Sequence, residues 1–234
     1  MRLSRTLLAF DRTSDPACDA VRNRGLRLAD RALSSEHPWR VYILAQRWFW
    51  LGCVFETLLG LGALALGLWL DVRWRELWVL SPANAAAGVA FAVPLLAFFG
   101  WAMHSRLRPL AQIRELLDER FVPLLGYWSV GQIALISLLA GIGEEALFRG
   151  SLQAGLTPAL GPLVAGALAA VAFGLGHAIT PAYVGLAMLV GALLGWEAHV
   201  TGGLLAPSLT HALYDFVALL YLRRGAWSSR NNRV

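Results

Sequence analysis

Residues 159–179 read ALGPLVAGALAAVAFGLGHAI, and this stretch decides the class of fold. Its length suits a transmembrane helix, because about 20 apolar residues span the hydrocarbon core of a bilayer. It holds no formally charged residue, and its one strongly polar side chain is His177. Its glycines and alanines allow neighbouring helices to approach closely. The stretch therefore predicts a transmembrane helix that packs among other helices.

The composition of the whole chain agrees with this prediction. Of 234 residues, 57% are hydrophobic and only 15% are charged, with a mean hydropathy of +0.56. Soluble domains carry about 25% charged residues, so a typical soluble protein and a disordered chain are both excluded. Two cysteines, Cys18 and Cys53, are too few for a disulfide scaffold. We therefore expect an all-α, multi-pass membrane protein.

About six apolar segments have the length of a transmembrane helix. A short cytoplasmic or membrane-surface N-terminal arm (1–47) precedes the transmembrane domain (48–222), and a basic cytoplasmic tail (223–234) follows it. Asp15 and Pro16 indicate a helix start within the arm, and Asp11 interrupts the first apolar run too early for a signal peptide. The expected spans are 49–70, 84–103, 121–143, 159–179, 182–199 and 203–222.

The arginines predict how the chain is oriented. Residues 1–48 hold nine arginines, while 104–120 and 223–234 hold four each and 71–82 holds two. Positively charged loops stay in the cytoplasm, so both termini are expected there. The expected location is the cytoplasmic membrane of a bacterium, with the lipid bilayer as a partner. No basic stripe interleaved with aromatic residues is present, so we expect no nucleic-acid partner.

Ionisable residues in the second half of the chain predict a functional site. A charge at membrane depth costs at least about 2.5–3.5 kcal/mol, so it needs a reason to be there. Between positions 121 and 222 the ionisable residues of this kind are Glu144, Glu145, Arg149, His177, Glu197, His199, His211 and Asp215. Glu197 and His199 are expected at the membrane interface, near the end of a span.

Helical spacing groups the other six into three clusters. Glu145 and Arg149 are four residues apart with the acid first, the favourable order for an ion pair. Glu144 points about 100° away and keeps no partner on its own helix, which suits a general base. The three clusters read E-E-x-x-x-R at 144–149, F-x-x-x-H at 173–177 and H-x-x-x-D at 211–215.

The clusters are expected to meet in one cavity. If the helix carrying Glu144 continues to a turn near Thr157 and the next span runs antiparallel, Glu144 and His177 lie on the same side of that turn. Two readings of the chemistry are open. The set Glu144, His177, His211 and Asp215 can bind Zn²⁺ and leave a position for water. Alternatively, the same groups hydrolyse an acyl bond without metal.

These three motifs resemble those of the CAAX protease and bacteriocin-processing family of intramembrane endopeptidases, which includes the Ras-converting endopeptidase. The resemblance covers roughly residues 125–220. It implies an all-helical protease that cleaves a peptide or protein substrate at the membrane. By this resemblance Glu144 and His177 activate water, with Glu145 and Arg149 in the same catalytic motif. His211 and Asp215 then stabilise the oxyanion or complete a metal site.

Other readings stay open on the sequence alone. A non-proteolytic immunity factor, scaffold or chaperone of the same fold would keep its function without Glu144. A transporter would use the buried carboxylates to relay ions, although no half-repeat symmetry is visible. Glu56, in the first expected span, either lines the cavity as an auxiliary acid or, as the favoured reading, pairs with a neighbouring helix or snorkels. The sequence predicts no oligomeric state.

Overall fold

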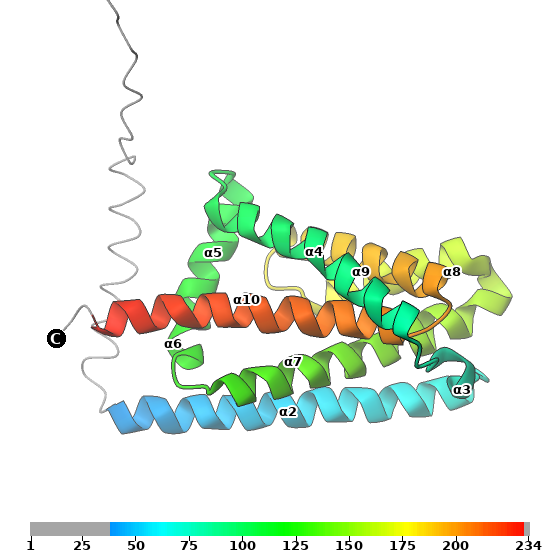
Figure 1. Ribbon diagram of the computed structural model, residues 1–234, viewed down its shortest axis with the longest axis horizontal. Helices are drawn as coiled ribbons and strands as arrows, with labels where there is room; N and C mark the ends of the chain where they lie inside the picture. The colour runs from blue at the N-terminus through cyan, green and yellow to red at the C-terminus, as the bar shows by residue number, and fades with distance from the viewer. Residues whose placement is uncertain (1–37, 232–234) are drawn as a thin grey trace, which may run out of the picture.

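The computed structural model describes residues 38–231, where every regular element is a helix and no strand occurs (Figure 1). The all-α prediction is confirmed. Residues 1–37 of the expected arm, with the helix start at Asp15 and Pro16, and the last three residues lie outside the described part. The helices are α2 (Pro38–Trp69), α3 (Trp74–Leu77), α4 (Pro82–His104), α5 (Arg108–Arg120), α6 (Val122–Leu125), α7 (Val130–Glu145), the π-helix η1 (Ala146–Ala154), α8 (Gly155–Gly176), α9 (Pro181–Thr201) and α10 (Leu205–Asn231).

Within residues 38–231, five continuous helical stretches are long and apolar enough to cross a membrane, and one of them turns back on itself. This stretch, Val130–Gly176, reverses at Gly161, whose φ of 76° and ψ of 160° favour glycine. The rings of Phe148 and Phe173, on either side of the reversal, lie 5.1 Å apart. In a straight helix they would be roughly 38 Å apart, at about 1.5 Å per residue. The expectation of about six passes and of a turn near Thr157 is therefore confirmed.

The prediction that the third span begins at residue 121 is wrong. The first residues of that expected span form the short helix α6 and a turn, and α7 begins only at Val130. The cause is local: Ser129 caps α7 through the backbone N–H of Gln132, whose side chain accepts from the backbone N–H of Ser129. The first expected span also begins too late, because α2 starts at Pro38.

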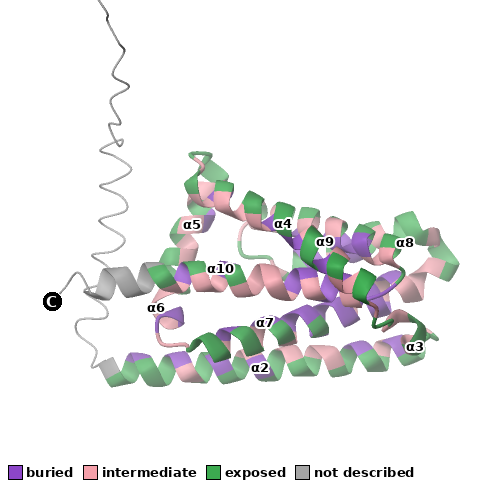
Figure 2. Ribbon diagram, in the orientation of Figure 1, coloured by how far each residue is buried: buried purple, intermediate pink, exposed green. Residues whose placement is uncertain are grey.

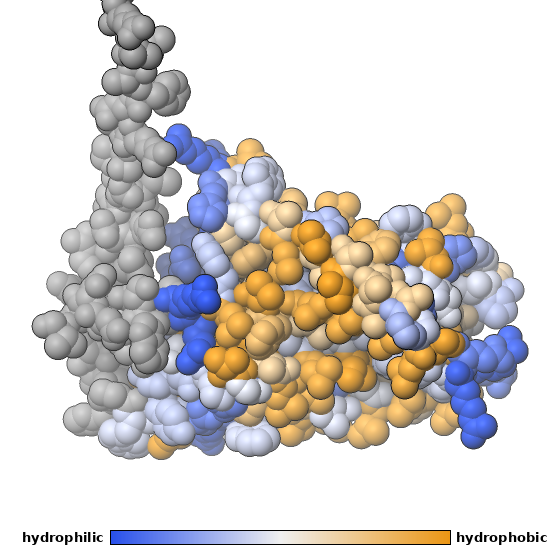
Figure 3. Space-filling model, in the orientation of Figure 1, coloured by the Kyte–Doolittle hydropathy of each residue, from blue (hydrophilic) through white to orange (hydrophobic). Residues whose placement is uncertain are grey.

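Polar ends and an apolar middle give the bundle the character of a membrane domain. The start of α2, helix α5 and the end of α10 lie at one end, and α3 lies at the other (Figure 1). The start of α2, helix α5 and the end of α10 belong to the three arginine-rich segments. Helix α3 belongs to the arginine-poor segment 71–82. Apolar residues cover the middle of the surface (Figure 3), and α2 exposes Leu51, Leu58 and Leu68. Such a surface suits contact with lipid.

Glycines let α7 approach two neighbouring helices at the level of the motif residues. A Cβ added at Gly141 would lie 2.6 Å from the backbone oxygen of Ser208 in α10. One added at Gly143 would lie 2.7 Å from the backbone oxygen of Glu56 in α2. Real Cβ atoms do not come so close to a backbone oxygen. These two contacts therefore hold the end of α7 against both helices.

We expect Gly141→Ala to lower the thermal stability of the protein in detergent, because the new methyl group pushes α7 away from α10. Gly62→Ala in α2 is the matched control, since a Cβ there meets nothing within 4 Å. In a helix, alanine is favoured over glycine by about 0.8–1.0 kcal/mol, so the control should keep or gain stability. Equal unfolding midpoints for the two variants would contradict the close approach at Gly141.

Candidate active site

The six motif residues come together where α7 and η1, the end of α8 and the middle of α10 meet. Buried residues gather in the same part of the bundle (Figure 2). The α-helix α7 ends at Glu145 and continues as the π-helix η1. Such widened turns often occur at functional sites. The change of helix type therefore coincides with the first motif.

Glu145 lies at the centre of this cluster. Its Oε1 atom is 2.6 Å from Nη1 of Arg149 and 2.9 Å from Nδ1 of His211. The side chains of Glu145 and Arg149 are both 0% exposed. The ion pair expected from the spacing of Glu145 and Arg149 is thus present. The sequence did not reveal the contact with His211, because 66 residues separate the two positions.

Arg149 fixes the position of Glu145 through a second set of contacts. Its Nη2 donates to the backbone oxygen of Gly191 in α9 at 2.7 Å. Its guanidinium carbon lies 4.7 Å from the ring centroid of Phe173, within the range of a cation–π interaction. Arg149 therefore joins η1, α8 and α9 around the buried carboxylate.

Glu144 and His177 face each other across a short gap. The distance from Oε2 of Glu144 to Nε2 of His177 is 3.7 Å, too long for a direct hydrogen bond. Nδ1 of His177 lies 2.8 Å from the backbone oxygen of Phe173, and the two rings stack at 4.6 Å. A carbonyl oxygen only accepts, so Nδ1 carries the proton and Nε2 of a neutral ring is an acceptor. A water lying to one side of this contact can hydrogen-bond to both atoms.

His211 and Asp215 form the second half of the cluster. Nε2 of His211 lies 3.6 Å from Oδ2 of Asp215, one helical turn further along α10. The ring of Phe173 packs edge-on against His211 at 5.9 Å. The imidazole thus lies between Glu145 on one ring nitrogen and Asp215 on the other.

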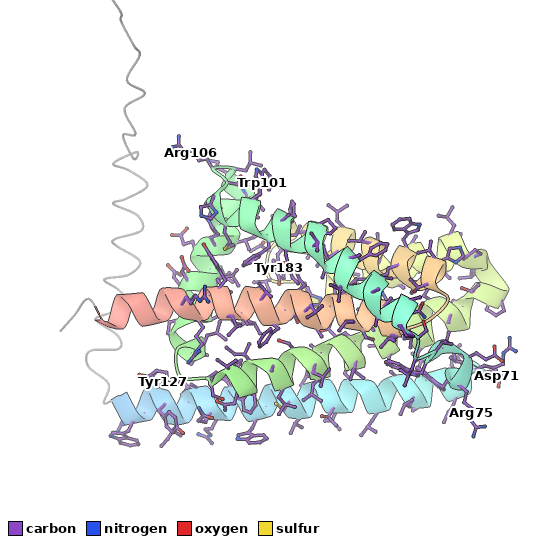
Figure 4. All side chains as sticks on the ribbon, viewed as in Figure 1. Asp71, Arg75, Trp101, Arg106, Tyr127 and Tyr183 are labelled. Carbon is purple, nitrogen blue, oxygen red and sulfur yellow. The ribbon has the colours of Figure 1, made fainter. Side chains whose placement is uncertain are left out.

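Two further residues border the site. The ring of Tyr183 lies 6.3 Å from that of His177, and Figure 4 shows Tyr183 in the middle of the bundle, away from the end where Asp71 and Arg75 lie. Sequence reasoning missed Tyr183, although Thr180 and Pro181 before it signal a helix start. Glu56 lies within electrostatic range of His211 and Asp215.

The favoured reading of Glu56 was a pair with a neighbouring helix or snorkelling. The pairing is wrong, whereas snorkelling stays a prediction, since the residue is half-buried. Its Oε2 atom is buried and has no hydrogen-bond partner, and no ion pair to this side chain occurs among residues 38–231. The backbone oxygen of Glu56 lies close to Gly143 of α7, the residue before Glu144. The alternative reading, an auxiliary acid beside the cavity, fits these contacts.

The expectation that Glu197 is interfacial is also wrong. Its side chain is 0% exposed, and its Oε1 lies 2.8 Å from Oγ1 of Thr210. The reason is that α9 continues to Thr201, so Glu197 lies a full turn before the helix end and faces α10. His199, two residues further on, is exposed as expected.

A zinc site would require at least three of these donor atoms to converge on one point. Within the described part of the chain, no group of three or more His, Cys, Asp or Glu side chains is arranged to hold a metal ion. Nδ1 of His211 already contacts Glu145, and Glu144 faces His177. As placed, Glu144, His177, His211 and Asp215 do not converge on one position where a metal ion could bind.

Comparison with known proteins agrees with the geometry of the motifs. Residues 126–217 match the family described as "Type II CAAX prenyl endopeptidase Rce1-like". The matched segment contains all six motif residues. No curated protein and no solved structure matches the chain. The resemblance indicated by the motifs is confirmed over this segment, which is similar to the type II CAAX prenyl endopeptidases of the Rce1-like family.

Proposed function

We propose that this protein is an intramembrane endopeptidase of the CAAX type, in which Glu144 and His177 activate a water molecule. The observation that carries the proposal is the 3.7 Å gap between Oε2 of Glu144 and Nε2 of His177. Glu144 is buried and its Oε2 has no hydrogen-bond partner. A carboxylate and an imidazole acceptor on either side of one water can remove its proton as it attacks.

The proposed reaction is hydrolysis of a peptide bond. The water oxygen attacks the carbonyl carbon, and Glu144 takes the proton that the water loses. His177 accepts the second hydrogen bond of the water and orients it. When the C–N bond breaks, Glu144 returns its proton to the leaving nitrogen, so protons and electrons balance.

His211 and Asp215 are proposed to stabilise the negative charge that develops on the substrate oxygen. Nδ1 of His211 contacts Glu145, which fixes the ring and leaves Nε2 toward Asp215. When both nitrogens carry protons, Nε2–H can donate to the oxyanion. Preorganised donors of this kind are often the largest single contribution to catalysis. Glu145 and Arg149 act as positioning residues.

The substrate is proposed to be a peptide or protein whose cleavage site lies at the membrane, with a C-terminal prenylated cysteine motif as the first class to test. Support comes from the prenyl endopeptidase family of residues 126–217 and from the apolar outer surface. The arginine-rich end of the bundle is proposed to face the cytoplasm of a bacterium, with both termini on that side.

The proposal is tested with the purified protein in liposomes and a synthetic peptide that ends in a farnesylated C-a-a-X sequence. We expect release of the last three residues, detected by mass spectrometry, and slower release from the same peptide without the farnesyl group. Cleavage of the unmodified peptide alone would move the substrate class to other membrane peptides. No cleavage of either peptide, or of a pool of membrane-associated peptides, would favour the non-proteolytic reading.

Metal content is measured on the same sample and on the variants His177→Ala and His211→Ala. The positions of the side chains favour equally low zinc in all three proteins, with cleavage by the wild type unaffected by a chelator. Near-stoichiometric zinc that is lost in both variants would instead establish a metal-centred hydrolase.

A further inference from the structure

A hydrogen-bonded junction of three helices lies next to the proposed active site, at Glu197, Thr210 and Gly88. Oγ1 of Thr210 in α10 is 2.8 Å from Oε1 of Glu197 in α9 and 2.8 Å from the backbone oxygen of Gly88 in α4. A Cβ added at Gly88 would lie 2.7 Å from the backbone oxygen of Ala206, so α4 and α10 are in close contact here. The junction is fully buried at Thr210 and Glu197.

The number of protons at this junction constrains the state of Glu197. A threonine hydroxyl has one proton to donate and can also accept. The carbonyl oxygen of Gly88 can only accept a hydrogen bond, so the hydroxyl proton of Thr210 is donated to Gly88. The 2.8 Å contact with Glu197 is then a hydrogen bond only if the carboxyl group donates. Both contacts are satisfied together when Glu197 carries a proton.

The electrostatic surroundings agree with a neutral carboxyl group. Among the described residues no ion pair includes Glu197. Arg149, a buried cation within electrostatic range of Glu197, gives its two terminal nitrogens to Glu145 and to Gly191. Oε2 of Glu197 is buried without a hydrogen-bond partner. An isolated charge in such a place is costly, and such a group takes up a proton instead.

We propose that Glu197 is a neutral carboxylic acid that donates its proton to Thr210, and that this junction positions His211, the next residue of α10. The protonation state is independent of the proposed function. The positioning role rests on the proposed function only in the experiment that measures peptide cleavage. Glu197 contacts neither the water nor the substrate in this scheme, so it is a positioning residue and not a catalytic one.

Infrared difference spectroscopy of the wild type against Glu197→Gln tests the protonation state. We expect the carbonyl band of a protonated carboxylic acid to be present in the wild type and absent from the variant. Thr210→Val should keep this band and shift its frequency, because the hydrogen bond is lost. A wild type without the band, with the signal of an ionised carboxylate lost in the variant, would overturn the proposal.

Nuclear magnetic resonance of ¹⁵N-labelled histidine tests the positioning role without needing a substrate. Glutamine can donate to Thr210 as a protonated acid does, so Glu197→Gln should leave the His211 ring signals in place. Glu197→Ala and Thr210→Val should both shift them. Exposed His199 provides a matched control, and His199→Gln should leave the His211 signals unchanged. Unshifted His211 signals in both Glu197→Ala and Thr210→Val would overturn the positioning role.

Once a peptide substrate is known, the same variants show whether Glu197 acts as a neutral hydrogen-bond donor or through a negative charge. We expect Glu197→Gln to keep kcat within about twofold, whereas Thr210→Val lowers kcat about tenfold with KM unchanged, as the loss of one positioning hydrogen bond implies. A loss of activity in Glu197→Gln as large as in Glu197→Ala would contradict a neutral donor, since the charge would then be what matters.

Discussion

Glu144→Gln is expected to abolish peptide cleavage by the purified protein, with a loss in kcat of about 10²–10⁴-fold, the usual contribution of a general base. The amide has the shape of the carboxyl group but cannot take a proton from water. Because Glu144 makes no hydrogen bond through Oε2 and no ion pair shorter than its 3.7 Å contact with His177, its replacement removes little that holds the fold.

The measurement is the initial rate of cleavage in liposomes, with the thermal unfolding midpoint recorded for each variant. Glu119→Gln, at an exposed position of α5, is the matched control and should cleave as the wild type does. A Glu144→Gln protein that unfolds at the wild-type temperature and still cleaves within a few-fold of the wild-type rate would remove Glu144 as the base. It would also leave Glu56, which is within electrostatic range of His211 and Asp215, as a candidate for that role.

The sequence predicted those features of the site that depend on local geometry. Glu145 and Arg149 are four residues apart on one helix, so their ion pair follows from helical spacing alone. The reversal between the two arms of the Val130–Gly176 stretch was expected near Thr157, and Gly161 with its positive φ makes it. Because both arms then run antiparallel, the meeting of Glu144 with His177 was also predictable from distances along the chain.

The features that were missed depend on contacts between distant segments. His211 has an acid four residues away, Asp215, and another on a different helix, Glu145. Spacing can suggest only the first of these. Glu145 makes the shorter contact with His211 because α10 packs closely against Gly141. This packing between distant segments cannot be inferred from local sequence.

Glu197 is a second residue whose position depends on a contact with a distant segment. Its place near the end of an apolar run is typical of an interfacial residue, and sequence reasoning assigned it there. In the structure Thr210 provides a buried partner from another helix, and the acid lies inside the bundle. A buried polar residue can be recognised only when its partner is known, because a side chain without one would be expected at the surface.

Arg149→Met is expected to destabilise the protein by about 3–5 kcal/mol, because it leaves the carboxylate of Glu145 buried without its cation. Both side chains of this pair are 0% exposed, and Arg149 also holds the backbone of Gly191. The unfolding midpoint in detergent is the measurement. Arg73→Ala breaks an exposed pair with Glu76, in which Arg73 is 79% exposed, and should change stability by no more than about 1 kcal/mol.

The double variant Glu145→Gln with Arg149→Met separates stability from activity. Removing both charges takes away the unpaired ion, so the double variant should unfold at a higher temperature than Arg149→Met alone. It should still fail to cleave, because Nδ1 of His211 then faces a neutral amide and no longer the Glu145 carboxylate. If Arg149→Met unfolds at the wild-type temperature, the buried pair does not hold the bundle together. If the double variant cleaves at the wild-type rate, Glu145 does not position His211 for the reaction.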